Sequence, residues 1–323
     1  MAKTKVEFVC RECGASHHQW AGQCLDCKEW NTLEEIVISQ ATSSKPESLK
    51  DLPASKVQNL TEIKAQNKDR LSTGLSELDR TLGGGLVDGS VVLIGGDPGI
   101  GKSTLILQAL AKLNSDNTTL YVSGEESAEQ VSERAIRLGI KEDILFIGET
   151  HLEKIIKLSK DIKPKVIVID SIQTMVTDLS ASAPGSVTQV RDCAAQLTQF
   201  AKQTNTILLM IGHVTKGGAL AGPRILEHMV DAVLYFEGDA GGRYRIIRAV
   251  KNRFGAVNEI SVFAMGEKGL QQVSNPSSIF LSNQENPSSG SMVMVTREAT
   301  RPLLVEIQAL VDQSNGTPKR VSV

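Results

Sequence analysis

The sequence has few aromatic residues and no long hydrophobic run. Phe, Trp and Tyr together make up 4% of its 323 residues, which argues against a nucleic-acid surface built from many aromatic side chains that stack on bases. No apolar run reaches the ~18 residues needed to cross a bilayer. The first ten residues lack the apolar core of a secretory signal. We therefore expect a cytoplasmic protein with no membrane partner.

Neither sign of charge predominates in the chain. Its formal net charge is -2, with 41% hydrophobic and 22% charged residues, an ordinary composition for a globular protein. Such a chain attracts nucleic acid only through local sites, on loops or on the surface of a ring. Its length predicts two or three domains rather than one.

The cysteines are concentrated at the N-terminus. Four of the five lie in two CxxC pairs, Cys10 with Cys13 and Cys24 with Cys27, and each pair can place two thiolates on one tight turn. Two such turns complete a closed tetrahedral site, which predicts one structural zinc ion. Redox motifs or disulfides are the alternatives, but the expected compartment is reducing and favours a metal. A unit of this size would be unfolded without its metal.

The residues around these knuckles, and the fifth cysteine, have simpler expected roles. We expect His17 and His18 to be surface residues, and Trp20 and Trp30 to pack over the knuckles. Cys193 is expected to be a core residue of a helix.

Changes in composition predict the domain organisation. A Cys-rich unit precedes a segment rich in Ser, Lys and Pro, which has the character of a linker. A second break rich in Ser, Asn and Pro follows the main apolar region. The predicted units are a zinc-binding domain at 1–40, a linker at 41–59, a main domain at 60–275 and an incomplete third domain at 276–323.

Short apolar runs alternate with amphipathic helices in the middle of the chain. This alternation predicts an α/β fold with a mostly parallel sheet covered by helices. The expected strands are Val91–Ile94, Thr119–Val122, Ile144–Ile147, Val166–Ile169 and Ile207–Ile211. The expected helices are Ser103–Leu113, Ala128–Leu138 with a capping box from Ser127 to Gln130, Leu152–Ser159 and Val187–Gln203. Four later runs suggest an antiparallel extension of the sheet: Ala232–Phe236, Tyr244–Val250, Ile260–Ala264 and Leu270–Val273.

A glycine-rich loop between a strand and a helix fits the P-loop pattern at every fixed position. Its glycines let backbone N–H groups point at phosphates, Lys102 supplies a positive charge, and the Ser103 hydroxyl is a ligand for Mg²⁺. The loop predicts an ATP site with Mg²⁺, ATP being the default nucleotide. The expected nucleotide-binding residues are Gly96, Asp97, Pro98, Gly99, Ile100, Gly101, Lys102, Ser103 and Thr104.

Acidic residues follow two neighbouring strands. Asp170 ends the apolar run KVIVID, an arrangement typical of the Walker B carboxylate that holds Mg²⁺ through water. Glu125 and Glu126 follow the strand Thr119–Val122, at the expected ligand crevice of a parallel sheet. Glu125 is the favoured catalytic base and Glu126 the second candidate. The alternative is that both are solvated charges at a helix N-terminus.

The order of these motifs resembles the RecA-like P-loop ATPase family, and within it a family of bacterial DNA repair proteins. The segments that carry the resemblance are the knuckle pair, LSTGLSELDRTLGGGLVDGSVVLIGGDPGIGKSTL, YVSGEES, VIVIDSIQT and KNRFG. The tail MVMVTREATRPLLVEIQALV resembles the start of a Lon-protease-like domain, which would make this the incomplete beginning of a third domain.

The resemblance implies a hexameric ring that hydrolyses ATP and acts on single-stranded DNA in recombination, alongside the recombinase RecA. It also implies that Lys251 and Arg253 of KNRFG reach the γ-phosphate bound by a neighbouring subunit. A simple turn with Asn252 and Gly255 at turn positions is the alternative for this segment.

Further residues are assigned by analogy with RecA-like rings. His213 follows the strand Ile207–Ile211, where such proteins place a polar sensor of the γ-phosphate, although an isolated histidine is more often structural. The loop KGGALAGPR would face the central channel and track phosphates. The candidate DNA contacts are Lys216, Arg224 and Arg191.

Three other functions stay open. A signalling ATPase or autokinase shares the core and the paired glutamates. A Lon-like protease is disfavoured, because its Ser–Lys portion would lie beyond Val323. An adaptor that binds a partner such as RecA through the knuckles is compatible with the motor.

Overall fold

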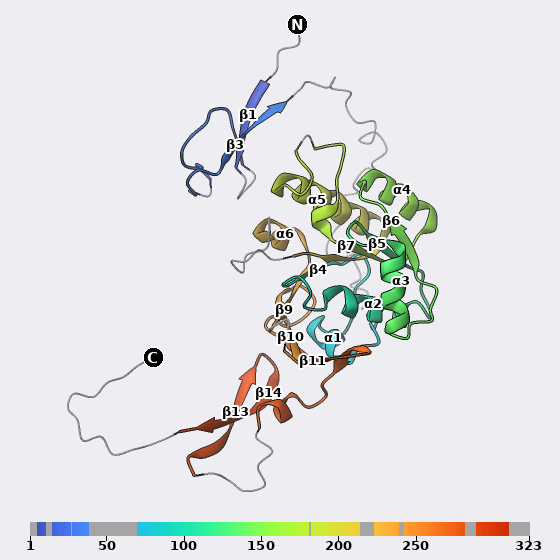
Figure 1. Cartoon of the computed structure of the whole chain (residues 1–323), viewed down its shortest axis with the longest axis vertical. Coiled ribbons are helices and arrows are strands. Elements are labelled where there is room, and N and C mark those ends of the chain that lie inside the picture. Colours follow the sequence, from blue (N-terminus) through green and yellow to red (C-terminus); the bar gives the residue numbers. More distant parts are fainter. Residues whose placement is uncertain are drawn as a thin grey trace, which may run out of the picture.

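Three separate sheets account for the strands of the described chain (Figure 1). The computed structural model describes residues 5–10, 15–26, 28–38, 70–180, 182–213, 223–238, 242–281 and 289–309. Within these ranges a three-stranded sheet, a nine-stranded sheet and a two-stranded hairpin follow one another along the chain.

The nine-stranded sheet forms the centre of the fold. Its order is β12-β11-β10-β9-β4-β8-β7-β5-β6, and the strands from β9 to β6 are parallel. Unbroken apolar runs form these strands because both faces of a parallel sheet are covered. The bounds are β4 Val91–Gly95, β5 Thr119–Ser123, β6 Leu145–Gly148, β7 Val166–Asp170, β8 Ile207–Ile211, β9 Ala232–Glu237, β10 Tyr244–Asn252, β11 Ile260–Gly266 and β12 Gly269–Gln272.

The predicted antiparallel extension begins one strand later than expected. β9 pairs in parallel with β4 and in antiparallel with β10, so the expectation that Ala232–Phe236 opens the antiparallel part is wrong. The physical reason is α6 (Pro223–Met229), which the sequence analysis did not predict. A helix between β8 and β9 allows the crossover that parallel strands require. From β10 to β12 the strands are antiparallel as predicted.

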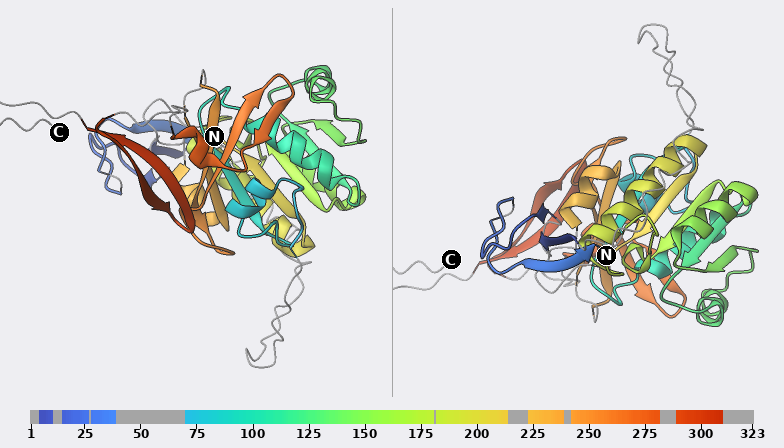
Figure 2. Two further views of the ribbon diagram at one scale, coloured as in Figure 1. Left: turned by 90° about the horizontal axis from the view of Figure 1, so that it is seen from below. Right: turned by 90° about the horizontal axis from the view of Figure 1, so that it is seen from above.

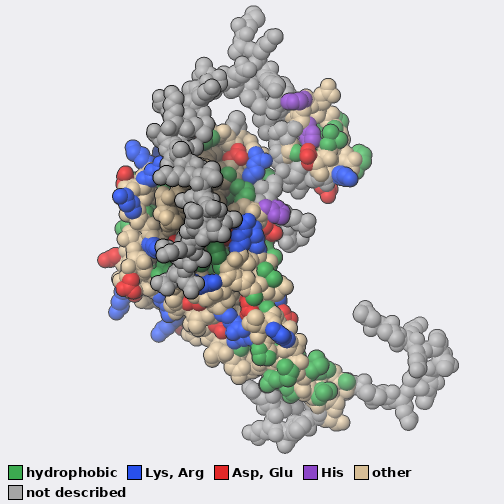
Figure 3. Space-filling view, turned by 180° about the vertical axis from the view of Figure 1, so that it is seen from behind, with side chains coloured by type: hydrophobic (Ala, Val, Ile, Leu, Met, Phe, Trp, Pro, Cys, Tyr) green, Lys and Arg blue, Asp and Glu red, His purple; other side chains and the backbone are tan. Residues whose placement is uncertain are grey.

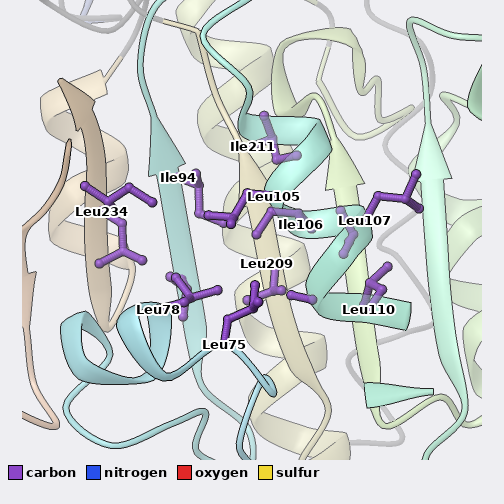
Figure 4. Packing of buried hydrophobic residues seen from close by; sticks show 14 of the residues in the cluster. Leu75, Leu78, Ile94, Leu105, Ile106, Leu107, Leu110, Leu209, Ile211 and Leu234 are labelled. Atoms are coloured by element: carbon purple, nitrogen blue, oxygen red, sulfur yellow. The ribbon is translucent and has the colours of Figure 1, made fainter. Parts of the chain in front are cut away.

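Helices cover both faces of the central sheet (Figure 2). α1 (Ser76–Thr81), α2 (Lys102–Leu113) and α3 (Ala128–Arg137) pack on one face. α4 (Leu152–Ile162), α5 (Val187–Thr204) and α6 pack on the other. Figure 4 shows leucines of α1 and α2 meeting side chains of β4, β8 and β9. The capping box from Ser127 to Gln130 is confirmed.

The N-terminal sheet is small and antiparallel. It has the order β2-β1-β3, from β1 (Lys5–Cys10), β2 (Ser16–His17) and β3 (Leu33–Ile38). Its register pairs Phe8 with His17 and Cys10 with Leu33. The pairing therefore brings His17 and Cys10 to the same end of this sheet.

The C-terminal hairpin forms a separate sheet that contacts α1 and β10 of the central unit. β13 (Ser291–Glu298) and β14 (Arg301–Gln308) pair with each other, after a short helical turn at Pro276–Ile279. Arg301 donates to Glu77 of α1 at 2.6 Å, and Arg248 of β10 donates to Glu298 at 3.0 Å. Apolar side chains of β13 are exposed, and they gather at this end of the molecule in Figure 3. The predicted boundaries at 40, 59 and 275 stay predictions.

None of the described helices has both the length and the apolar character that a membrane span requires.

Candidate nucleotide site and metal centre

The phosphate loop connects β4 to α2 at the carboxyl edge of the parallel strands. Gly96 and Gly101 have φ values of 144° and 113°, which side chains rarely adopt. A Cβ on Gly96 would also lie 2.8 Å from the Cβ of Phe236. Asp97, Pro98 and Gly99 are exposed and Ile100 is buried. Ser103 and Thr104 lie in the first turn of α2, so the helix N-terminus faces the same loop.

Lys102 is folded back onto this loop. Its Nζ donates to the carbonyl oxygens of Gly96 at 2.7 Å and Asp97 at 2.8 Å. Burial lowers the pKa of Lys102 to about 8, against the opposing charges of Asp170 and Glu125. The amine is therefore a desolvated cation beside two carboxylates, suited to bind an anionic ligand.

Asp170 ends β7 and is buried beside Ser103. The Tyr121 hydroxyl donates to its Oδ2, and Ser103 also hydrogen-bonds to it. Burial raises the pKa of Asp170 above the usual value, while the hydrogen bonds from Tyr121 and Ser103 oppose that shift. A carboxylate and a hydroxyl at this position fit the oxygen ligands that Mg²⁺ prefers. The sequence analysis missed Tyr121, whose only signal is a tyrosine between Leu120 and Val122 in a predicted strand.

Glu125 lies at the end of β5, in contact with two polar side chains. Its Oε1 accepts a hydrogen bond from Ser171 and lies 3.1 Å from Nε2 of His213. The hydrogen bond with His213 lowers the pKa of Glu125; burial opposes the shift, and Ser171 and Lys102 reinforce it. Glu125 is therefore charged at neutral pH. Ser171, which the sequence analysis did not single out, directly follows Asp170, so its hydrogen bond connects the Glu125 carboxylate to the end of β7.

Glu126 has a different environment from its neighbour. Arg134 of α3 donates to both of its carboxylate oxygens, one at 2.6 Å. Ser123 accepts a hydrogen bond from the Glu126 backbone at 2.9 Å. The Glu125 side chain therefore contacts His213 and Ser171, whereas the Glu126 side chain is bound by Arg134 of α3.

His213 follows β8, opposite Glu125. Besides its contact with Glu125, its carbonyl oxygen accepts a hydrogen bond from Gln173 at 3.3 Å. This position lies where a sensor was expected, and the sensor role stays a prediction.

Lys251 is the next-to-last residue of β10, where the register shifts between Ala249 and Lys251, and Arg253 follows the strand. The Lys251 Nζ donates to the carbonyl oxygens of Glu227 at 2.5 Å and Val230 at 2.8 Å, at the C-terminal end of α6. Arg253 donates to Asp231 at 3.2 Å and is 58% exposed. Since Lys251 belongs to the strand, the simple-turn alternative fits only the bend that follows it.

The candidate DNA contacts are only partly described. Arg191 of α5 lies 3.3 Å from Asp192 and is half-exposed. Lys216 and the side chain of Arg224 lie outside the described residues.

The N-terminal unit carries the candidate metal centre. Cys10 and Cys24 are each 1% exposed and pack with Leu33, whereas Cys13 and Cys27 lie outside the described residues. Donor atoms of His17, Cys24 and Asp26 lie within 4.8 Å of one another. Buried thiols with nearby donor atoms fit a bound metal ion.

Two expectations for the neighbouring residues are corrected. His17 is only 12% exposed, and its Nε2 lies 3.4 Å from the Cys24 sulfur, so it is not a surface residue. The pairing of β2 with β1 turns it towards the knuckle. Trp20 and Trp30 flank Gly22 but are 60% and 67% exposed, so they cover the knuckles less than expected.

Comparisons with known proteins find one family for the metal-binding unit and another for the nucleotide-binding unit. A family model described as "AAA domain" matches residues 58–219, and one described as "Rubredoxin metal binding domain" matches residues 8–35. The chain is 55% identical to "DNA repair protein RadA" of Pseudomonas aeruginosa, over 100% of this chain and 72% of that protein. The corresponding protein of Escherichia coli is 53% identical, over 100% and 72%, and that of Bacillus subtilis 48%, over 100% and 71%.

A solved structure shows the same fold at low sequence identity. It is described as an "ATPase Domain" and is 14% identical, with a TM-score of 0.56, and the match covers 65% of this chain and 94% of that one. The mostly parallel sheet and the P-loop of the present chain agree with the RecA-like core that the motifs predicted. Together, the P-loop at the sheet edge, the N-terminal metal-binding unit and these relatives show that the chain belongs to the RadA family of DNA repair proteins, RecA-like P-loop ATPases.

Proposed function

We propose that the chain is an ATP-driven motor stimulated by single-stranded DNA, which processes recombination intermediates together with the recombinase RecA. In this proposal it works as a hexameric ring, with each nucleotide held between two subunits. The DNA repair names of the relatives support the process, and the ATPase core supports the chemistry.

The observation that carries the ring is the separation of the cations from the acidic cluster. Glu125 and Asp170 lie at the ends of β5 and β7, whereas the contacts described for Lys251 and Arg253 are with α6 and Asp231. Within the described part of the chain, the side chain of Arg253 is partly exposed and its described contact is with Asp231, which leaves it available to a neighbour's site. A cation supplied in this way stabilises charge on the transferring phosphoryl group.

Each residue of the site has a proposed part in hydrolysis. Backbone N–H groups of residues 96–104, except that of Pro98, which has none, and the Lys102 amine would bind the phosphates. Ser103 and Asp170 would hold Mg²⁺, which neutralises phosphate charge when bound. Glu125 would orient the attacking water and accept its proton, and Ser171 and His213 would fix the position of its carboxylate. His213 would report on the γ-phosphate because it contacts Glu125 directly.

The DNA and metal parts of the proposal rest on fewer observations. Lys216, Arg224 and Arg191 are the proposed DNA contacts. Lys216 and Arg224 follow β8 in the chain, and segments after parallel strands begin on the ligand side of the sheet, whereas Arg191 is proposed as a cation of α5. We propose one structural zinc ion held by Cys10, Cys13, Cys24 and Cys27, because four thiolates form a closed site.

ATP turnover by the zinc-loaded chain, with and without single-stranded DNA, tests the proposal. We expect DNA to raise turnover, and Lys102→Ala to remove both basal and stimulated activity. Basal turnover that DNA leaves unchanged would instead favour a signalling ATPase, and transfer of labelled γ-phosphate to the protein would identify an autokinase.

A further inference from the structure

One buried arginine lies behind the phosphate loop and has no part in the site described so far. Arg245, the second residue of β10, is 2% exposed. Its Nε donates to the carbonyl oxygen of Ile100 at 2.9 Å. Its Nη1 donates to the carbonyl oxygens of Gly242 at 2.5 Å and Tyr244 at 3.0 Å. The guanidinium therefore joins the start of β10 to the middle of the phosphate loop.

The hydrogen bond from Arg245 to Ile100 holds the peptide group between Ile100 and Gly101 of the phosphate loop. Ile100 immediately precedes Gly101, and the peptide between them is trans. In a trans peptide the C=O and the following N–H point in opposite directions. A donor that holds the Ile100 oxygen from behind therefore directs the Gly101 N–H away from Arg245. The buried positive charge also favours a phosphate on the opposite side of this peptide, because screening is weak there.

Apolar side chains of β11 and β12 lie close to Gly101, the residue on the other side of the same peptide bond. A Cβ on Gly101 would lie 2.8 Å from Met265 of β11 and 3.4 Å from Leu270 of β12. The loop is thus positioned by β10–β12 as well as by the parallel strands that lead into it. These strands lie outside the range of the matching "AAA domain" model, 58–219.

We propose that Arg245 is a positioning residue for ATP hydrolysis, which orients the Ile100–Gly101 peptide and so sets the affinity for the nucleotide phosphates. Arginine suits this role because its planar fork donates to separate acceptors at once, whereas a lysine ammonium is a single point of charge. The inference rests on the phosphate loop as the nucleotide site and is independent of the DNA motor and the ring.

The test compares the same substitution at two arginines of β10. Arg245→Lys removes the fork behind the loop. Arg248→Lys is the matched control, because Arg248 donates to Glu237 at 2.8 Å and Glu298 at 3.0 Å instead. The Kd of MgADP and the number of binding sites per chain are measured by displacement of a fluorescent ADP analogue from the full chain.

We expect Arg245→Lys to raise the Kd about 10-fold or more, the scale of one charge-assisted hydrogen bond, with an unchanged number of sites. Arg248→Lys is expected to leave the Kd within about 2-fold, the scale of a surface substitution. A purely structural Arg245 would lower the number of sites and leave the Kd of the folded fraction unchanged, which overturns the proposal.

A second variant, Arg245→Gln, keeps one donor without the charge and is expected to weaken MgADP as well. If neither variant folds, Arg245 is a residue of core stability and the proposal is overturned. If the unaltered chain binds no MgADP, the nucleotide site itself is wrong, which is a different failure from an unchanged Kd in Arg245→Lys.

Discussion

The parallel and antiparallel halves of the central sheet differ in burial and in the side chains they bring to the site. β4, β5, β7 and β8 are buried at every position, whereas β10 alternates between buried and partly exposed residues. The parallel half ends in the acidic residues Glu125 and Asp170. In the antiparallel half, Arg245 contacts Ile100 of the phosphate loop, and Lys251, near the end of β10, contacts Glu227 of α6. Strands covered on both faces are mostly apolar and here carry their acidic residues at or after their ends, whereas a strand with one partly exposed face can carry cations along its length.

The largest expected effect concerns Arg253, the exposed arginine that follows β10. Arg253→Ala should lower ATP turnover by about 10³–10⁵-fold, the range for a cation that acts on the transferring phosphoryl group. If it acts between subunits, mixing Arg253→Ala with Lys102→Ala chains should restore part of the activity, because some interfaces then combine two intact halves.

Arg243→Ala is the control, since Arg243 is exposed and lies 5.6 Å from the centre of the Tyr244 ring. Activity that mixing fails to restore would argue that both groups act within one subunit.

The next effect concerns the acidic end of β5. Glu125→Gln should lower kcat by about 10²–10⁴-fold, the contribution of a general base, and should leave MgATP binding nearly intact. Glu126→Gln is the control, because Arg134 holds both of its carboxylate oxygens, and it should change kcat far less. A larger loss from Glu126→Gln, by steady-state assay, would reverse the assignment.

The third prediction asks whether the β13–β14 hairpin stabilises the ATPase core, to which Arg301 of β14 connects it through Glu77 of α1. Arg301→Leu leaves Glu77 buried without its ion-pair partner, which should cost about 3–5 kcal/mol in the free energy of unfolding. Arg297→Leu is the control, since Arg297 donates to the Ala299 carbonyl oxygen at an exposed site. Denaturant unfolding measures both variants, and equal effects would show that the buried pair contributes little.

The smallest expected effect is a pH dependence of nucleotide affinity. The pKa of Lys102 in the free chain is about 8 because of burial, and bound phosphates would raise it. Above pH 8 the amine must take up a proton for the nucleotide to bind. Affinity for MgADP should therefore fall up to about tenfold per pH unit. Titration calorimetry in buffers of different ionisation enthalpy should detect the proton uptake at about pH 9, one unit above that pKa, and its absence would contradict the lowered pKa.

Local patterns were sufficient for much of the parallel half. The strand before the P-loop, the helix after it and the capping box at Ser127 agree with the predictions within a few residues, because each depends on neighbours in the chain. The parallel pairing of β9 was not predicted, since it depends on α6, whose first two residues, Pro223 and Arg224, belong to the segment KGGALAGPR that was predicted to be a loop.

Contacts between distant residues explain what the sequence analysis missed at the site. Tyr121 meets Asp170 across 49 positions, and Arg245 meets Ile100 across 145. His17 was assigned to the surface because nothing in its local sequence indicates the pairing that turns it to Cys24.

The sequence by itself determined the chemistry available: a phosphate loop, two acidic strand ends, a cation pair and two CxxC knuckles. The order of these motifs along the chain resembles RecA-like ATPases, and that resemblance could be seen without a structure because each motif consists of residues close together in the sequence. Only the tertiary structure decided which carboxylate meets His213 and Ser171, and which arginine holds the phosphate loop. Those choices depend on strand pairing and on partners for buried charges, which arise only when distant segments pack together.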